Sequence, residues 1–501
     1  MKVKLIGNNK LDNTNSNGLI YMGLLVGCFI CCLLILKAGY AIGAIVACMP
    51  FILIATYYIF QKPVILFVVF LLINYLIMGI NRYNLIPVPI TSVIDSTLGL
   101  LMIAILFKSS YERSSCKLSL NAFTGVSLVW FIYCFTQILN NTTGAINIAA
   151  WYQGVRGMAI YPLVAAFMIP LVMKRFRDIR WFMLLWAFLT LLGAFKGYWQ
   201  RNHGFDSYEL AWILGPGART HLIHTGIRYF SIYTDASCFG AAMGMSMVVF
   251  GIGVLYTKNK WLKALYLITS IAGAYGMIIS GTRGSLVVPF AGITLFVLIS
   301  RNWKMVVGSL FFVVVSLIFL KMTDIGNDNM FIRRMRSAFD LNDPSLQTRL
   351  INRENLSKDM QNLPVGVGIG VSRENISSSN YYYDAATTPP DSWYVTIWTR
   401  TGIVGLYIYL GVLAFTIIYG SYILMFRIKN KELKGILSGM LCGAFGVMIA
   451  AYGSDCYAQF PNGFLIYACQ TLVIIAPHLD KKMSEEKDID KNTNELKELP
   501  V

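Results

Sequence analysis

The sequence predicts an all-α protein, a polytopic membrane bundle of about 12–14 transmembrane helices with one long external loop. Three observations predict this class. Of the 501 residues, 56% are hydrophobic and 13% are charged, whereas soluble globular chains carry about 25% charged residues. Apolar runs of about 18 residues or more recur along the chain, which is the length that a membrane-spanning helix requires. The runs are continuous and do not alternate as barrel strands do, so the spans are predicted to be helices.

About fourteen segments reach the ~20 residues that a bilayer requires. The first, near residues 19–36, is too long for a signal peptide and no clear small-residue cleavage site follows it. We therefore interpret it as an anchor. The approximate centres of the predicted spans are Phe29, Val46, Leu72, Leu101, Trp130, Val164, Leu189, Val248, Leu267, Gly292, Val313, Val412, Gly446 and Val473.

The net charge of +17 is concentrated in short hinges between these spans. This is the positive-inside pattern of cytoplasmic turns, so it indicates contact with membrane lipids and argues against a nucleic-acid partner. The topology that follows places both termini in the cytoplasm. The basic hinges contain Lys174, Arg175, Arg177 and Arg180; Lys258, Lys260 and Lys263; Arg301 and Lys304; and Arg427, Lys429, Lys431 and Lys434.

The same topology divides the chain into five parts, of which the long external loop is the most informative. A loop of roughly seventy residues is uncommon between packed helices and is typical of a functional or disordered segment. The last part is polar and charged, which predicts disorder. The parts are a cytoplasmic N-terminus (1–17), a transmembrane region (18–320) with an external loop at about 197–234, the long external loop (321–392), the C-terminal membrane helices (393–479) and a disordered cytoplasmic tail (480–501).

Polar motifs gather on the external side of this topology. Arg228 to Ser237 leads into an apolar helix, where Asp235 is either a functional carboxylate or only a helix N-cap. Arg283 lies in the short turn 280–285, where an arginine opposes the positive-inside trend and offers a planar fork suited to phosphate. The alternative without a function is a capped helix turn in which the arginine binds no ligand. Both segments therefore predict candidate anion-binding arginines.

The long external loop contributes two further motifs. Arg349 precedes the glycine run Pro364–Gly370, which we interpret as a tight turn because no strand–helix context supports a nucleotide fold. Two prolines precede Asp391 and Ser392, either of which can cap the next helix; Asp391 could instead be a general base for a hydroxyl. Trp393 and Tyr394 come next and suit an interface.

Histidine and cysteine give weaker signals. His203, His221 and His224 lie in the other large external loop, where His221 and His224 are candidate acid–base or substrate-binding groups, although a surface histidine more often has no such role. The ten cysteines lie mostly inside spans and are interpreted as small buried hydrophobes. No metal-ligand spacing appears, and the sequence predicts neither a metal nor a cofactor.

Taken in order, these motifs resemble the O-antigen ligase and O-antigen polymerase family of bacterial membrane glycosyltransferases. The resemblance extends over roughly residues 196–410. It rests on five segments in the family's order, and the last of them closes with Gly402 and Gly405. One position departs from the family, because Asp391 stands where its members usually carry histidine. The segments are KGYWQ (196–200), RYFSIYTDAS (228–237), SGTRG (280–284), Arg349 with PVGVGIG (364–370), and DSWYVTIWTRTGIVGL (391–406).

The resemblance implies an enzyme on the periplasmic face of a bacterial inner membrane. Its donor would be a glycan on an undecaprenyl-pyrophosphate carrier, and its acceptor lipid A–core for a ligase or a second carrier-linked glycan for a polymerase. Arg228 and Arg283 would stabilise the departing pyrophosphate without a metal, and Asp391 would deprotonate or orient the acceptor hydroxyl. A transporter or flippase with a similar number of spans is the alternative of another class. The implied substrate-binding residues are Arg349, Asp235, Trp393, Tyr394, His221 and His224.

Overall fold

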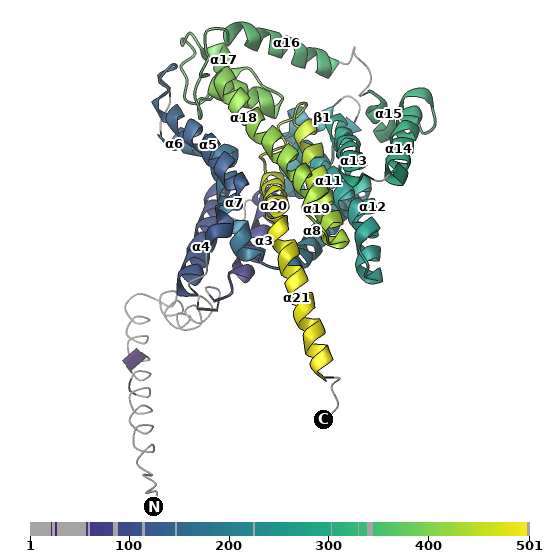
Figure 1. Ribbon diagram of the computed structural model, residues 1–501. Helices are drawn as coiled ribbons and strands as arrows, with labels where there is room; N and C mark the ends of the chain where they lie inside the picture. Colours follow the sequence, from purple (N-terminus) through teal and green to yellow (C-terminus); the bar gives the residue numbers. More distant parts are fainter. Residues whose placement is uncertain are drawn as a thin grey trace, which may run out of the picture.

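The computed structural model confirms the polytopic all-α bundle (Figure 1). It describes residues 61–83, 89–112, 116–145, 148–223, 226–301, 303–328, 330–337 and 344–497, together with positions 22, 26, 27, 57 and 58. Within these residues, ten helices are long and apolar enough to cross a membrane, and a bent pair of helices would make eleven. The predicted centres Phe29 and Val46, the N-terminal segment 1–17 and His224 lie outside the described residues.

The first half of the bundle follows the predicted spans closely. Each predicted centre from Leu72 to Gly292 falls within a helix of the candidate spans. The elements are α3 (Pro63–Asn81), α4 (Ile90–Tyr111), η1 (Cys116–Ser119), α5 (Ala122–Thr136), η2 (Gln137–Leu139), α6 (Ile148–Val155), the π-helical turn η3 (Arg156–Ile160), α7 (Tyr161–Val172), α8 (Phe176–His203), α9 (Ser207–Leu214), α10 (Ala218–His221), β1 (Leu222–Ile223), β2 (Gly226–Ile227), α11 (Ala236–Tyr256), α12 (Lys260–Ile279), η4 (Arg283–Leu286) and α13 (Val287–Ser300).

The second half contains the long external loop and the last helices. The span predicted around Val313 is the 20-residue helix α14. The span predicted around Val473 is a pair of helices bent by 59°. The elements are α14 (Trp303–Met322), α15 (Met330–Arg336), α16 (Pro344–Asp359), α17 (Tyr383–Thr387), α18 (Trp393–Phe426), α19 (Lys431–Ala450), α20 (Asn462–Ile474) and α21 (Ala476–Lys497).

Helix α11 is at the centre of the packing. It contacts α12, α19 and α13, and α13 also packs against α19. Glycines allow these close approaches: a Cβ on Gly273 of α12 or Gly439 of α19 would press into the backbone of α11. Figure 1 shows α15, α16, α17 and β1 at one end of the bundle, while α21 extends from the opposite end. The predicted external segments therefore gather at one end.

Two of the four basic hinges meet at the end from which α21 extends. Arg180 makes two hydrogen bonds to Glu432, at 3.0 and 3.1 Å, and Arg175 lies 3.7 Å from Glu486 of α21. Asp480 accepts the backbone N–H groups of residues 429 and 430. Two hinges that the positive-inside pattern assigned to one side thus lie together.

The tail differs from its prediction. Residues 480–501 were expected to be disordered, but α21 continues as a helix to Lys497. Two features favour the helix. Lys481 and Glu485 form an i,i+4 ion pair at 3.8 Å, which is a helix-stabilising arrangement. The contacts of Asp480 and Glu486 with the hinges also fix the first turns. The composition of this segment shows that it is polar, but it does not show that Asp480 and Glu486 contact the basic hinges.

The glycine run of the long loop packs on a break in α18. Gly402 has φ 71° and ψ −175°, so the 34-residue α18 consists of two helical segments joined at a kink. The carbonyls of Thr399 and Arg400, which the kink releases, accept the N–H groups of Val367 at 2.9 Å and Gly368 at 3.1 Å. The run is thus the predicted tight turn, and it anchors the long loop to this helix.

Candidate functional site

A polar cavity of about 320 Å³ lies among the external motifs. Its wall combines four segments that are distant in sequence: the end of the 197–234 loop with the start of α11, the turn after α12, the long loop, and the turn between α19 and α20. The structure therefore brings together most of the residues that the sequence singled out. The lining residues are Thr220, His221, Arg228, Asp235, Ala236, Ser237, Thr282, Arg283, Gly284, Arg349, Pro389, Pro390, Asp391, Gly453, Ser454 and Asp455.

Arg228 is positioned by a small β-hairpin. Strands β1 and β2 pair antiparallel, with Leu222 opposite Ile227, and Arg228 follows the second strand directly. Its backbone N–H donates to the carbonyl of His221 at 3.0 Å, and its Nη1 donates to the carbonyl of Thr220 at 3.3 Å. The hairpin thus fixes the stem of this arginine on the cavity wall.

Asp235 is both a cap and a lining residue. It is the N-cap of α11, and its Oδ1 accepts the N–H of Cys238 at 2.8 Å. The capping alternative is therefore correct for this residue. Asp235 also lines the cavity, so it adds a negative charge to a wall that carries three arginines.

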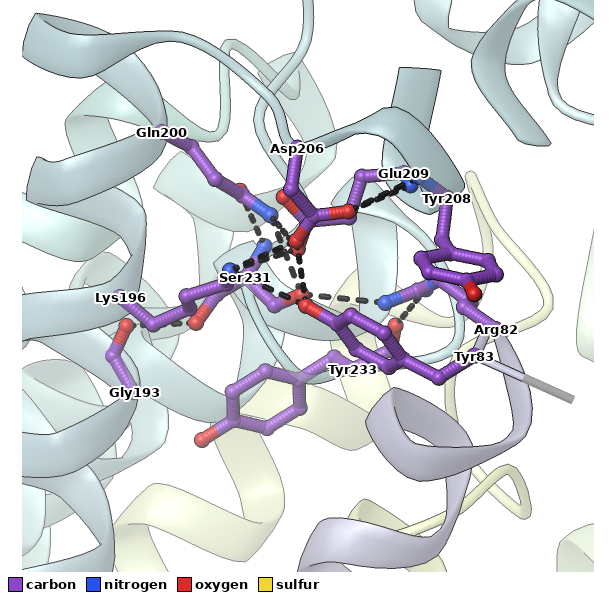
Figure 2. A network of polar contacts seen from close by, with 10 residues as sticks. All are labelled: Arg82, Tyr83, Gly193, Lys196, Gln200, Asp206, Tyr208, Glu209, Ser231 and Tyr233. Atoms are coloured by element: carbon purple, nitrogen blue, oxygen red, sulfur yellow. Dashed lines mark hydrogen bonds and ion pairs between the residues drawn. The ribbon is translucent and has the colours of Figure 1, made fainter. Parts of the chain in front are cut away.

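A buried network holds the segment between Arg228 and Asp235 in place (Figure 2). Ser231 has φ 53°, an unfavourable value for a residue with a side chain. Its N–H donates to Gln200 Oε1 at 2.8 Å, and its Oγ donates to the carbonyl of Gly193 at 2.6 Å. Arg82 donates to the carbonyls of Ser231, Tyr233 and Thr234. These bonds stabilise the strained turn that aims Arg228 and Asp235 at the cavity.

The same network contains paired charges. Lys196 lies 2.9 Å from Glu209 and 3.6 Å from Asp206, and Figure 2 shows both carboxylates grouped with Gln200 above the Ser231 turn. Burial lowers the pKa of Arg82 to about 10, with the nearby Glu209 opposing the shift. Arg82 therefore stays charged at neutral pH, as its three carbonyl acceptors require.

Arg283 is presented by a turn of small polar residues. Ser280 Oγ and Thr282 Oγ1 lie 2.9 Å apart, and Ser285 Oγ donates to the carbonyl of Thr282 at 2.6 Å. The turn fits closely on α11 because a Cβ on Gly240 would overlap the side chains of Ser280 and Thr282. Nη1 of Arg283 donates to the carbonyl of Ser337 at 3.4 Å. The arginine is thus held on a hydrogen-bonded turn, beside the end of α15.

The long loop covers the other side of the cavity. Helix α16 places Arg349 on the wall, and its Asn352 donates to Asp391 Oδ2 at 3.4 Å. Arg353 donates to the carbonyl of Tyr452 at 2.9 Å and lies over the Tyr452 ring at 4.3 Å. The helix therefore rests on the turn between α19 and α20 and on the residues just before α18.

Asp391 does not cap α18. The N-cap is Ser392, without a side-chain capping bond, and Ser392 Oγ donates instead to the carbonyl of Ala451 at 3.3 Å. Asp391 has φ 50°, a left-handed conformation that turns the chain after Pro389 and Pro390. The capping alternative is therefore wrong for Asp391, which lines the cavity while its Oδ2 accepts from Asn352.

Two predicted substrate-binding aromatics do not line this cavity. Trp393 is buried, and its Nε1 donates to Tyr409 Oη at 2.7 Å. Tyr394 Oη donates to the carbonyl of Met448 at 2.7 Å, and its ring faces a separate apolar groove. Both aromatics lie in the first turn of α18, which packs against the end of α19; Trp393 is buried there, whereas Tyr394 is half-buried.

The apolar groove adjoins the polar cavity. It has a volume of about 1000 Å³ and runs between η4, α13, α18 and α19, under α16. Leu406, Leu410 and Leu413 supply much of its wall. The residues that line both the groove and the cavity are Arg283, Gly284, Arg349 and Gly453. The two arginines thus stand at the junction of an apolar and a polar space.

Asp455 is a charged lining residue that the motifs did not single out as functional. It lies in the turn between α19 and α20. Its Oδ1 is buried and has no hydrogen-bond partner among the residues that the structure describes. Burial raises the pKa of Asp455; the positive charge of Arg400 opposes this shift and the negative charge of Asp235 adds to it. A search for isolated carboxylates in short external turns could have found it.

His221 has a positioning role in the structure. Its Nε2 accepts the N–H of Ala236 at 3.2 Å, and its Nδ1 lies 3.1 Å from the carbonyl of Gly217. The ring must therefore be neutral, with the proton on Nδ1. Burial lowers the pKa of this imidazole, which agrees with that state. Both nitrogens are engaged, so His221 supports the start of α11 rather than exchanging protons.

This bonding predicts a pH effect on stability. Because the pKa of His221 is lower in the folded state than in the unfolded state, the unfolded chain binds more protons below about pH 6.5. Stability should therefore fall as the pH drops from about 7 through the folded pKa. Thermal unfolding of the purified protein between pH 7.5 and 5 would measure this. His221→Gln should weaken the dependence, and His203→Gln, which changes an exposed histidine, should leave it intact; equal slopes in all three proteins would contradict the assignment.

Comparison with known proteins agrees with the geometry. Residues 265–410 match the O-antigen ligase family model. The match confirms the resemblance predicted from the motifs, and it runs from α12 into α18, so it includes Arg283, Arg349 and Asp391. The chain is also 21% identical over 364 residues to the teichuronic acid biosynthesis protein TuaE of Bacillus subtilis, covering 69% of this chain and 70% of TuaE. These findings support a function of the ligase or polymerase type in polysaccharide biosynthesis.

Proposed function

We propose that this chain is a membrane glycosyltransferase that moves a glycan from an undecaprenyl-pyrophosphate carrier to an acceptor hydroxyl. The observation that carries the proposal is the junction of two spaces. A polar cavity and an apolar groove share Arg283 and Arg349, and a lipid-linked pyrophosphate has this same division between an apolar tail and an anionic head. The matched O-antigen ligase region contains both arginines.

The donor would bind across this junction. Its polyprenyl chain would lie in the groove beside Leu406 and Leu410, and its pyrophosphate would meet Arg283 and Arg349. Arg228, on the cavity wall, would approach from the glycan side. When the bond between the sugar and the phosphate breaks, negative charge develops on the leaving pyrophosphate, and preorganised cations stabilise that charge. Because arginines supply the positive charge, the proposal needs no metal.

The acceptor would enter the polar cavity. Asp391 on its wall would orient or deprotonate the acceptor hydroxyl, in the place where related enzymes usually carry histidine. Helix α16 lies over the cavity and would exclude water, so that transfer competes with hydrolysis. His221 and Asp235 would shape the wall through the start of α11.

The position of the cavity supports an enzyme at the outer face of the membrane. Helix α16, which supplies Arg349 to the cavity wall, lies at the end of the bundle opposite α21, and α21 contacts one of the basic hinges. Basic hinges are typical of the cytoplasmic side, so the proposed active site faces the periplasm from a bacterial inner membrane. A transporter, the other class predicted, would bind its cargo near the midplane.

The acceptor separates two forms of the reaction. A ligase would transfer the glycan to lipid A–core, and a polymerase would transfer it to a second carrier-linked glycan. One observation favours the polymerase as a second candidate: TuaE is named for the biosynthesis of teichuronic acid, a polysaccharide. The chemistry at Arg228, Arg283 and Arg349 is the same in both forms.

Deletion of the chain in its native host tests the proposal. A ligase predicts accumulation of full-length carrier-linked polymer, and a polymerase predicts accumulation of single carrier-linked repeats. Mass spectrometry of extracted carrier lipids would measure both. Carrier-linked glycan that is unchanged in amount and length would contradict either enzyme, and repeats retained on the cytoplasmic face would indicate a transporter.

A further inference from the structure

The turn between α19 and α20 places a carboxylate where the sequence motifs provide none. Asp455 lines the polar cavity together with Asp391 and Asp235. Of these three carboxylates, Asp235 accepts a hydrogen bond from the N–H of Cys238, and Asp391 accepts one from the side-chain amide of Asn352. Asp455 differs because its buried Oδ1 has no hydrogen-bond partner among the described residues. A buried acceptor without a donor is costly unless a ligand supplies one.

The surrounding protein fixes this carboxylate from several sides. The N–H of Trp393 donates to the carbonyls of Ala451 at 3.1 Å and Ser454 at 3.4 Å, so the start of α18 holds the turn. Arg353 of α16 holds it through the carbonyl of Tyr452. The turn is therefore anchored by both elements that frame the acceptor side of the cavity.

Charged and titratable groups face Asp455 from each neighbouring element. The positive charge of Arg400 in α18 favours its ionised form, and the negative charge of Asp235 disfavours it. The nearby side chain of Gln459 also favours ionisation. Burial outweighs these effects and keeps the pKa raised. The other titratable groups are His221, Arg228, Arg283, Arg349 and Asp391 on the cavity wall and the thiols of Cys238 and Cys456.

We propose that Asp455 accepts the proton of the acceptor hydroxyl during glycan transfer, while Asp391 orients that hydroxyl. The inference rests on the proposed function. It assigns the unpartnered Oδ1 to the hydroxyl proton of a sugar, which is the donor that this oxygen lacks. Asp391, which is bonded to α16 through Asn352, lies where the covering helix can position an incoming acceptor.

The step balances without a further reactant. The hydroxyl oxygen forms a bond to the anomeric carbon of the donor glycan as its O–H proton passes to the Asp455 carboxylate. The bond from the anomeric carbon to the phosphate oxygen breaks, and its electron pair leaves with the carrier pyrophosphate, next to Arg283 and Arg349. Asp455 then returns the proton to solvent. A general base contributes about 10²–10⁴-fold in rate.

Steady-state transfer by purified full-length protein in lipid nanodiscs tests the assignment, with a carrier-linked glycan as donor. Asp455→Asn should lower kcat by about 10²–10⁴-fold while the Kd for carrier pyrophosphate changes less than about threefold. Asp455→Glu should keep part of the rate, with an altered acid limb in the pH profile. Asp391→Asn should raise the acceptor KM and retain the wild-type acid limb. Glu374→Gln, an exposed change in the same loop, is the control.

The outcomes separate this inference from the proposed function. Wild-type transfer together with near-normal transfer by Asp455→Asn would overturn the assignment and leave the glycosyltransferase intact. Equal losses of carrier binding and rate in Asp455→Asn would also overturn it, because they indicate a structural role. Absence of transfer by the wild type with either acceptor class would overturn the proposed function, and the assignment with it.

Discussion

Replacing Arg283 with alanine is expected to reduce glycan transfer by about 10²–10³-fold, the cost of removing one preorganised donor from a developing charge. Arg283 lines both the polar cavity and the apolar groove, so it would meet the pyrophosphate at the point where the carrier changes from tail to head. The measurement is the release of carrier pyrophosphate from a carrier-linked glycan. The fold should persist because the turn is held by Ser280, Thr282 and Ser285.

A lysine at the same position sharpens this prediction. Lysine keeps the charge but loses the planar fork that binds phosphate through two parallel bonds. Arg283→Lys should therefore recover only a fraction of the lost rate. Arg333→Ala is the matched control, because Arg333 is an exposed arginine of the long external loop and does not line the cavity. Near-normal transfer by Arg283→Ala at normal protein levels would contradict the donor-binding role.

The sequence predicts the fold class and most of the cavity for a physical reason. Span length and the positive-inside pattern are set by the bilayer itself, so they hold without knowledge of tertiary contacts. Once the basic hinges are assigned to one side, parity alone puts Arg228, Arg283 and Asp391 on the other. The cavity that these residues share then requires only that the helices pack closely.

What the sequence does not predict depends on contacts between distant segments. Asp455 is one acidic residue in a short turn, and only the packing of α16 and α18 on that turn makes it a cavity residue. His221 has a side chain that could act as an acid or a base, but its two ring nitrogens hydrogen-bond to the N–H of Ala236 and the carbonyl of Gly217. Asp391 follows two prolines as a cap would, but φ 50° directs its side chain elsewhere. In each case a partner far along the chain determines the role.

The glycine run shows the same dependence in the backbone. Three glycines with φ of 78°, 104° and 91° are compatible with many turns, and the sequence does not reveal that this turn pairs with a break in a membrane helix. The pairing nevertheless explains both motifs together. The kink needs two N–H donors for its released carbonyls, and the glycine run supplies them from Val367 and Gly368.

This pairing makes Gly402 the position where a single methyl group should be most damaging. Its φ of 71° and ψ of −175° lie in a region that only glycine occupies readily, and a residue held there costs about 1–3 kcal/mol. A Cβ would also overlap the carbonyl of Pro364. Gly402→Ala should therefore lower the thermal unfolding midpoint and reduce transfer at least about tenfold, since a displacement of about 1 Å can cost 10² in rate.

Gly411→Ala provides the matched control, because it adds the same methyl group to the same helix. A Cβ at Gly411 would have no neighbour within 4 Å, and alanine there replaces a residue of low helix propensity. We expect Gly411→Ala to unfold at or slightly above the wild-type midpoint with normal transfer. If both variants behaved alike, the contact between the glycine run and the kink would not support the site. Loss of transfer by Gly402→Ala alone would show that the long external loop acts through the contact of its glycine run with the kink in α18. Gly402 itself does not line the cavity, so a direct effect on the cavity wall would not explain the loss.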